Sequence, residues 1–138
     1  MSGIVQREWN LGTCRESADG TYGCTIKIPK CSAGSVHVGL AIHRENALIP
    51  EVQTMKLRIQ NMESHATECL GKHLEPNESF EIDIKANYWK NSRGEHSGGA
   101  DVGSFNMIDG SMKVRIDILS GRPKGATITI VALASEGL

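Results

Sequence analysis

Histidine and cysteine are the residues of this chain best suited to metal binding or nucleophilic chemistry; the sequence contains five and four of them, respectively. His37 and His43 fall on one face of an expected strand, but six residues at about 3.3 Å each place them roughly 20 Å apart, too far to share an ion. The four cysteines follow no Cys-x-x-Cys spacing typical of zinc sites. We therefore expect no metal and no cofactor, and interpret the histidines (His37, His43, His65, His73 and His96) as surface or edge residues.

The cysteines have two plausible states. Cys14 and Cys24 flank Ala18-Asp19-Gly20, a turn sequence that would place them on neighbouring strands, so a disulfide between them is geometrically feasible. A chain without a secretory leader meets a reducing cytosol, in which buried free thiols are commoner. We predict free thiols, including those of Cys31 and Cys69, with the Cys14–Cys24 disulfide as the alternative.

Sequence motifs give no support for catalysis. The chain lacks Gly-x-Ser-x-Gly, a Walker loop, a dinucleotide fingerprint and His-Glu-x-x-His. Glu81 and Asp83 alternate with Lys85 along one face of an expected strand, where solvation and cross-strand pairing explain them better than a glycosidase pair across a cleft. We predict no catalytic residue and expect a protein that is not an enzyme.

One cluster of side chains has the composition of a binding site. Tyr88 and Trp89 end an expected strand, and Asn91 and Arg93 follow in a glycine-rich segment. Aromatic rings beside amide and guanidinium groups are used to bind sugars and lipid headgroups. Because successive strand residues point to opposite faces, we expect Tyr88 to pack and Trp89 to be exposed. The alternative is that Trp89 covers the end of the fold, the commoner role of a lone tryptophan.

Alternation of apolar and polar residues predicts an antiparallel all-β fold. We expect strands over residues 4–9, 22–28, 35–43, 52–60, 79–88 and 126–134. Asp109-Gly110 between two alternating runs predicts a hairpin over residues 103–116, with Phe105 opposite Val114. The strand count is typical of a single-domain antiparallel β-sandwich of about seven to eight strands, with residues 1–12 as an N-terminal arm.

Three segments depart from simple alternation. Residues 61–71 are the candidate helix, with Asn61 as its N-cap and Gly71 just beyond its end. Residues 91–100 contain no large apolar side chain and three glycines, so we expect a mobile surface loop. Residues 130–133 are apolar on both faces, which suits a central strand or one covered by a partner.

Composition narrows the function classes. The 138 residues contain 15 basic and 16 acidic side chains, a net charge of −1 that argues against nucleic acid as a partner. No apolar run approaches the roughly 20 residues of a membrane span, and the first residues lack the apolar core of a signal peptide. We expect a soluble protein made in the cytoplasm, either released without a leader or built into an extracellular particle.

Two segments resemble a known family. Residues 71–82 contain a Gly-Lys and Pro-x-Glu turn before a strand, and residues 99–109 contain a Gly-Ser-Phe strand that ends at Asp109. Together they resemble the middle of aegerolysins, small acidic β-sandwich proteins, and residues 125–130 are similar to the family's last strand. The family's Tyr-Trp-Asp-Cys-Pro-Trp segment has no counterpart after Met112. The resemblance implies a module that recognises membrane lipids and recruits a larger pore-forming partner.

These observations leave three hypotheses. The first is a non-enzymatic module that binds a membrane lipid or glycan, as the small component of a two-component pore-forming toxin, through Tyr88, Trp89, Asn91 and Arg93. The second is a self-associating structural subunit of a virion, appendage or other assembly, suggested by the low net charge, the arm and residues 130–133. The third is an intracellular immunity or inhibitor protein.

Overall fold

The computed structural model describes residues 4–29, 35–44, 52–90, 96–106, 111–123 and 125–137, and every regular element in this part of the chain is a β-strand. The strands are β1 (Ile4–Thr13), β2 (Arg15–Glu16), β3 (Tyr22–Ile28), β4 (Ser35–Arg44), β5 (Val52–Asn61), β6 (Thr67–Cys69), β7 (Lys72–Leu74), β8 (Ser79–Lys90), β9 (His96–Asn106), β10 (Met112–Ser120) and β11 (Thr127–Gly137). All the pairings between them are antiparallel. The predicted antiparallel all-β class is confirmed.

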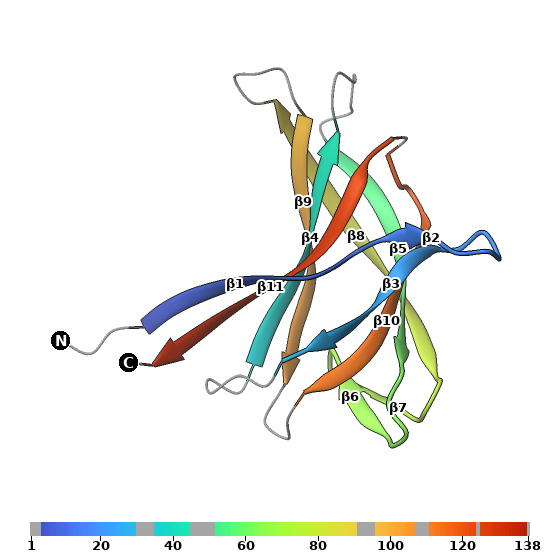
Figure 1. The fold of residues 1–138 in the computed structure, drawn as a ribbon, viewed down its shortest axis with the longest axis vertical. Coiled ribbons are helices and arrows are strands. Elements are labelled where there is room, and N and C mark those ends of the chain that lie inside the picture. Colours follow the sequence, from blue (N-terminus) through green and yellow to red (C-terminus); the bar gives the residue numbers. More distant parts are fainter. Residues whose placement is uncertain are drawn as a thin grey trace.

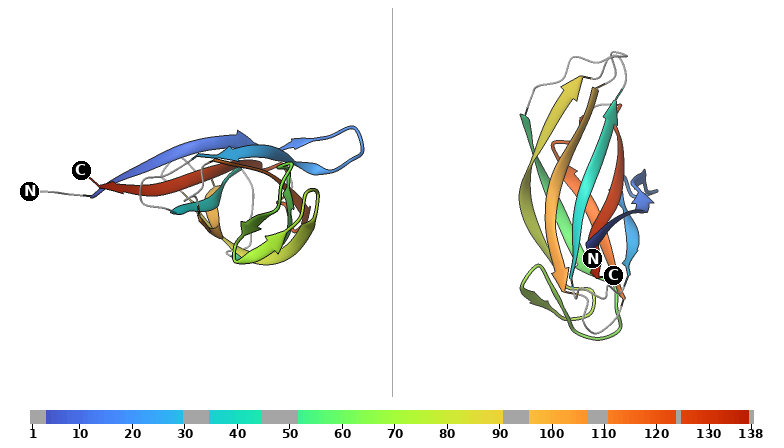
Figure 2. Two further views of the ribbon diagram at one scale, coloured as in Figure 1. Left: turned by 90° about the horizontal axis from the view of Figure 1, so that it is seen from below. Right: turned by 90° about the vertical axis from the view of Figure 1, so that its left-hand side faces the viewer.

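Nine of the strands form one sheet, in the order β1-β11-β4-β9-β8-β5-β10-β3-β2, and β6 and β7 form a separate hairpin at one end (Figure 1). The sheet curls into a nearly closed, barrel-like form (Figure 2). It closes where β1 approaches β3 near Gly12, which lies beside Cys24 and Ile26; among the described residues no backbone ladder joins these two strands. The architecture therefore differs from the expected sandwich: one long twisted sheet curls toward closure, and the described part of the chain contains no second large sheet packed against it.

The interior is filled by one face of each long strand. The predicted inward and outward positions are confirmed over residues 22–28, 35–43, 52–60 and 79–87, where inner side chains are buried or partly buried. The largest fully buried side chains are Phe105, Ile26, Ile28, Ile42, Met55, Leu57, Ile59, Ile116, Ile128, Ile130 and Val36. Burial of such aliphatic groups, each worth about 1.5–3 kcal/mol, provides the main drive for closing the sheet.

The predicted hairpin over residues 103–116 is wrong in its pairing. Phe105 on β9 lies opposite Val36 on β4, and Val114 on β10 lies opposite Ile26 on β3 and Asn61 on β5. The two strands keep the predicted inward faces, but each has other neighbours on both sides. Asp109 and Gly110 lie outside the described residues. A turn signal is local, whereas the choice of neighbours here depends on how the whole sheet closes.

The predicted helix over residues 61–71 is also wrong. Asn61 is fully buried at the end of β5, where its side chain accepts a hydrogen bond from the Glu63 amide and donates to the carbonyls of His65 and Leu74. Its side chain thus stabilises a turn that leads into the β6–β7 hairpin. Gly71 is a turn residue of that hairpin and, like the residue before it, has positive φ (78°).

The expected loop over residues 91–100 is only partly described. Residues 91–95 lie outside the described residues, but residues 96–100 form the start of β9. Gly98 and Gly99 pair with β4 on one side and β8 on the other, and a Cβ on Gly99 would lie 3.3 Å from the Leu40 carbonyl. Gly98 and Gly99, two of the glycines that suggested a loop, instead permit close strand packing.

Residues 4–12 of the expected arm form most of β1, which lies at one edge of the sheet and pairs with β11. The far ends of β1 and β11 extend beyond the barrel as a two-stranded ribbon (Figures 1 and 2). Nearer the barrel, β11 lies between β1 and β4, with Ile130 and Ala132 buried and Leu133 39% exposed. Over residues 130–133, β11 therefore has a strand on each side but lies next to the edge of the sheet rather than at its centre.

Candidate functional site

Two of the four predicted binding residues, Tyr88 and Trp89, lie on β8 where it pairs with β9. Tyr88 and Trp89 are near the end of β8, where they pair with Gly98 and Ser97 of β9, respectively. Their side chains, and all of Asn91 and Arg93, lie outside the described residues. The structure therefore places only the backbone of Tyr88 and Trp89, and the described surface beside this part of β8 is a groove.

This groove arises because β8 and β9 diverge. They pair only from residue 87 onward on β8; before that, β8 pairs with β5 and β9 continues along β4. Leu70, from the β6–β7 turn, approaches β9 so closely that a Cβ on Gly103 would lie 2.7 Å from its methyl group. The resulting opening continues across β4 to β11 as a groove of about 940 Å³.

The groove has an apolar lining and a polar rim. The apolar side chains are Leu40, Leu70, Ile82, Ile84, Ala100, Val102, Val131 and Leu133. The polar ones are His37, Asp83, Lys85, Asn87 and Asp101, and Gly39 and Gly99 add backbone without side chains. A concave surface with apolar walls and a few polar groups is typical of small-ligand sites. Asn87 is also two positions before Trp89 on β8, so the groove leads to the predicted binding cluster.

His37 is held at the rim by residues of the neighbouring strand. Its Nε2 lies 3.0 Å from Asp101 Oδ1, and its Nδ1 lies 3.3 Å from Ser104 Oγ. Serine, histidine and aspartate are the residue types of a hydrolytic triad, in which a buried carboxylate orients the imidazole. Here the Asp101 side chain is 86% exposed, so water competes for its hydrogen bonds. We therefore interpret the three side chains as a hydrogen-bonding rim.

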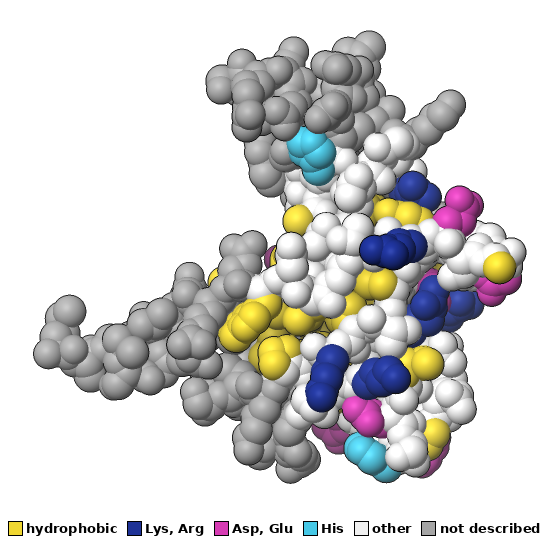
Figure 3. Space-filling model, viewed as in Figure 1, with side chains coloured by type: hydrophobic (Ala, Val, Ile, Leu, Met, Phe, Trp, Pro, Cys, Tyr) yellow, Lys and Arg dark blue, Asp and Glu magenta, His cyan; other side chains and the backbone are white. Residues whose placement is uncertain are grey.

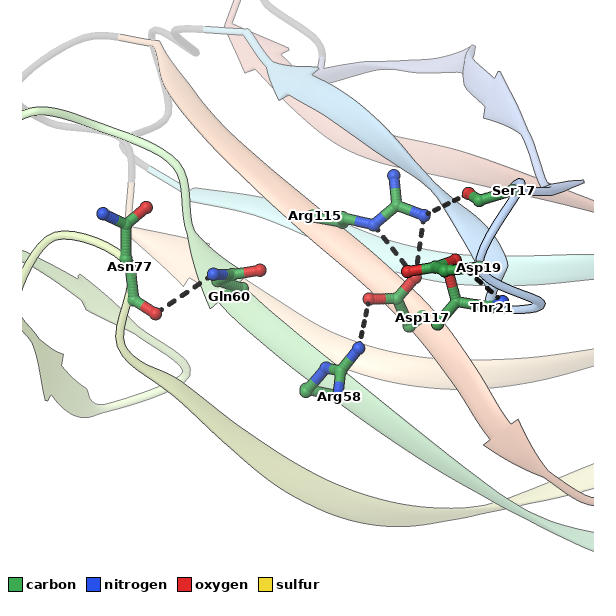
Figure 4. A network of polar contacts seen from close by, with 8 residues as sticks. All are labelled: Ser17, Asp19, Thr21, Arg58, Gln60, Asn77, Arg115 and Asp117. Carbon is green, nitrogen blue, oxygen red and sulfur yellow. Dashed lines mark hydrogen bonds and ion pairs between the residues drawn. The ribbon is translucent and has the colours of Figure 1, made fainter.

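A second polar cluster lies across β5 and β10 (Figure 4). Asp117 is only 1% exposed, and its carboxylate accepts hydrogen bonds from Arg58 Nη2 at 3.0 Å and Arg115 Nε at 3.0 Å. Arg115 also donates to Ser17 Oγ at 3.3 Å. Gly23 lies opposite Asp117, and its missing side chain leaves room for the carboxylate, which would lie 2.5 Å from a Cβ. Both carboxylate oxygens are paired with arginine and the carboxylate is buried, so we interpret this cluster as stabilising the fold.

A pair of thiols lies at the seam between β1 and β3. Cys14 is buried, Cys24 is half-buried, and their side chains are hydrogen-bonded. That hydrogen bond lowers the pKa of Cys24 because it stabilises the thiolate, whereas the same contact and burial raise the pKa of Cys14. Cys14, Cys24 and Cys69 are free thiols, and Cys31 lies outside the described residues.

Sequence reasoning missed the His37 group because its members are 64 and 67 residues apart and meet only through the β4–β9 register. It also missed Asp117, although an acidic residue between Ile116 and Ile118 is a signal for a buried, paired carboxylate.

Among the described residues, no three histidine, cysteine, aspartate or glutamate side chains are grouped so that they could hold a metal ion. The same part of the chain contains no helix long and apolar enough to cross a membrane.

The fold and groove define an all-β protein with a concave surface on a curled antiparallel sheet. Comparison of the chain with family models, with curated proteins and with solved structures finds no match. The resemblance to aegerolysins stays a prediction.

Proposed function

We propose that the protein is a non-enzymatic binding module that holds a hydroxyl-rich ligand, a glycan or the headgroup of a membrane lipid, in the groove beside Trp89. The observation that carries this proposal is the groove itself, with apolar walls and a rim of His37, Asp101, Lys85 and Asn87. Carboxylate, amide and imidazole groups hydrogen-bond to hydroxyls, while the apolar walls suit the C–H faces of a sugar ring or the upper part of a lipid. A larger pore-forming partner belongs to the same proposal.

The described polar groups favour binding over catalysis. Asp83, Lys85 and Asn87 project from one exposed face of β8, spaced two residues apart as strand geometry requires. Such a row can contact successive groups of an extended ligand. Asp101, the only carboxylate hydrogen-bonded to His37 among the described residues, is well hydrated and suited to accepting hydrogen bonds from hydroxyls.

The test is a glycan array together with vesicles of phosphatidylcholine, with and without a glycolipid. We expect a triple Lys85→Ala, Asn87→Ala, Trp89→Ala variant to bind at least about tenfold more weakly, from the loss of several hydrogen bonds and a ring contact. Lys27→Ala, an exposed lysine on β3 outside the groove, is the matched control. Glycan binding without vesicle binding identifies a free glycan as the ligand, and binding only to vesicles that contain the glycolipid identifies a lipid headgroup. Binding to plain phosphatidylcholine, whose headgroup has no hydroxyl, contradicts a hydroxyl-rich ligand. Unchanged binding by the triple variant contradicts the proposed site.

A second candidate function is favoured by one specific observation. The β1–β11 ribbon extends beyond the barrel and leaves strand edges unpaired among the described residues. Open edges of this kind pair readily with another chain. The second candidate is therefore a subunit of a multi-subunit assembly.

A further inference from the structure

The two thiols at the seam of the barrel lie opposite each other on adjacent antiparallel segments. β2 pairs with β3 so that Arg15 is opposite Gly23, and the same register continued by one residue puts Cys14 opposite Cys24. Opposite residues of such a pair have Cβ atoms about 4.5–5.5 Å apart, and here the two side chains are hydrogen-bonded. Because a disulfide needs a Cβ separation of about 3.5–4.5 Å, a small movement is enough to bond the two sulfurs.

Cys14 lies where the two ends of the sheet meet. It connects β1 to β2, which are the first and last strands in the order of the sheet, and its backbone amide donates a hydrogen bond of 2.8 Å to the Ile128 carbonyl of β11. Cys24 lies on β3, where it pairs with Ile116 of β10. In the described part of the chain β1 and β3 share no backbone ladder. A bond between the two sulfurs would therefore link the two sides of the seam covalently.

The two thiols differ in access and in reactivity. Cys14 is buried, whereas Cys24 is half-buried and can be reached from solvent. The hydrogen bond with Cys14 lowers the pKa of Cys24, and the positive charge of Arg115 acts in the same direction. Figure 3 shows Lys and Arg side chains on the face that carries β3 and β10, which favours the approach of an anionic reagent. A reagent from solvent therefore reacts first with Cys24, and Cys14 is placed to react second.

We propose that Cys14 and Cys24 are a reversible redox pair, which closes the seam with a disulfide when the oxidant is a small-molecule disulfide such as oxidised glutathione. The Cys24 thiolate attacks one glutathione sulfur; a mixed disulfide forms, the glutathione S–S bond breaks, and one glutathione thiolate leaves and takes a proton from solvent. Cys14 Sγ then attacks Cys24 Sγ, and the second glutathione leaves with the Cys14 proton. The protein loses two electrons and two protons, and two glutathione thiols gain them.

The proposed bond would stabilise the seam and remain open to reduction. It would close a ring over residues 14–24, whose turn is already ordered by a 2.7 Å hydrogen bond from the Ser17 amide to the Thr21 carbonyl. A crosslink restricts the unfolded chain, so the oxidised protein should be more stable than the reduced one. Because Cys24 is only half-buried, a reducing thiol can reach its sulfur and reverse the reaction.

The experiment equilibrates the full chain in glutathione buffers from reduced to oxidised, blocks free thiols with iodoacetamide and maps disulfides by mass spectrometry. We expect a Cys14–Cys24 link at least about tenfold more abundant than any link through Cys69, which is fully buried against Met112. The oxidised protein should unfold roughly 5–10 °C above the reduced one. Cys14→Ser should retain glutathione on Cys24 and lose this response of Tm, whereas Cys69→Ser, the matched control, should keep it.

This inference is independent of both proposed functions, and each other outcome counts against it. Absence of the Cys14–Cys24 link in the wild type under oxidised glutathione overturns the redox pair, and no substitution is needed to see this. A link that leaves Tm unchanged overturns the closure of the seam. Glutathione retained by Cys14 in Cys24→Ser, with none on Cys24 in Cys14→Ser, overturns the assigned order of attack. Circular dichroism checks that each variant keeps its fold.

Discussion

Replacing Asp117 by asparagine tests whether the buried ion cluster stabilises the barrel. The carboxylate accepts hydrogen bonds from Arg58 Nη2 and Arg115 Nε, each at 3.0 Å. Its Oδ1 also forms an ion pair with Arg115 Nη2 at 2.9 Å. Asparagine has the same size but no charge, and its amide group must face one of the arginine donors. The variant therefore loses the charge and puts two donors against each other.

The expected cost is about 3 kcal/mol of unfolding free energy. Breaking a buried ion pair typically costs about 3–5 kcal/mol, and we take the low end because the Arg58 and Arg115 side chains are 35% and 24% exposed and can turn to water. An unfolding entropy of about 2.1 cal/mol/K per residue over 138 residues converts this cost into a fall of about 10 °C in Tm.

Thermal unfolding followed by circular dichroism measures the effect. The matched control is Asp101→Asn, because Asp101 is also hydrogen-bonded to a basic side chain, His37 at 3.0 Å, but is 86% exposed. We expect the control to stay within about 2 °C of the wild type. Adding Arg58→Met to the Asp117→Asn variant should cost little more, since the pair is already broken. If Asp117→Asn unfolds within about 2 °C of the control, the cluster does not stabilise the fold as argued.

Two further predictions concern the seam and its surroundings. Gly23→Ala should destabilise the protein by about 2 kcal/mol or more, because a Cβ there would lie 2.2 Å from the Ile116 carbonyl oxygen. The control is Gly12→Ala, whose Cβ would meet nothing nearer than 3.4 Å. Equal Tm values for the two variants would refute the argument. Cys24, whose pKa is lowered, should form thiolate and react with iodoacetamide at lower pH than Cys69, because burial raises the pKa of Cys69 to about 11. Mass spectrometry measures the labelling of each cysteine from pH 6 to 10. Equal labelling of the two cysteines at neutral pH would contradict the prediction.

Local pattern was enough to predict the strands and their inward faces. Val38, Leu57 and Ile59 are fully buried as alternation indicates, because a strand exposes every second side chain to the same environment wherever it lies in the sheet. The two-residue period therefore survives errors in topology. β9 and β10 show this directly: Phe105 and Val114 are both buried, although they do not face each other as predicted.

Neighbour choice was not predictable by the same means. A two-residue turn signal such as Asp109-Gly110 concerns a few residues, whereas closing nine strands into one sheet depends on all of them at once. The same limit applies to the misread segments. Asn61 and Gly71 have the residue types of helix ends, but the hydrogen bonds of Asn61 to Glu63 and Leu74 determine that the chain turns there.

For the candidate site, too, the local feature was predictable from sequence and the feature that depends on the whole sheet was not. Trp89 could be singled out from sequence because an aromatic residue next to polar groups is a local feature. The groove beside it could not, since its walls come from four strands and one turn that are brought together only by closure of the sheet. The groove exists because β8 and β9 separate at Asn87, so its shape depends on where that separation begins. A substitution that extends the β8–β9 pairing beyond Asn87, toward the start of β8, should narrow the groove and reduce ligand binding while Trp89 is unchanged. Such a variant separates the contribution of the groove walls to binding from that of the Trp89 ring.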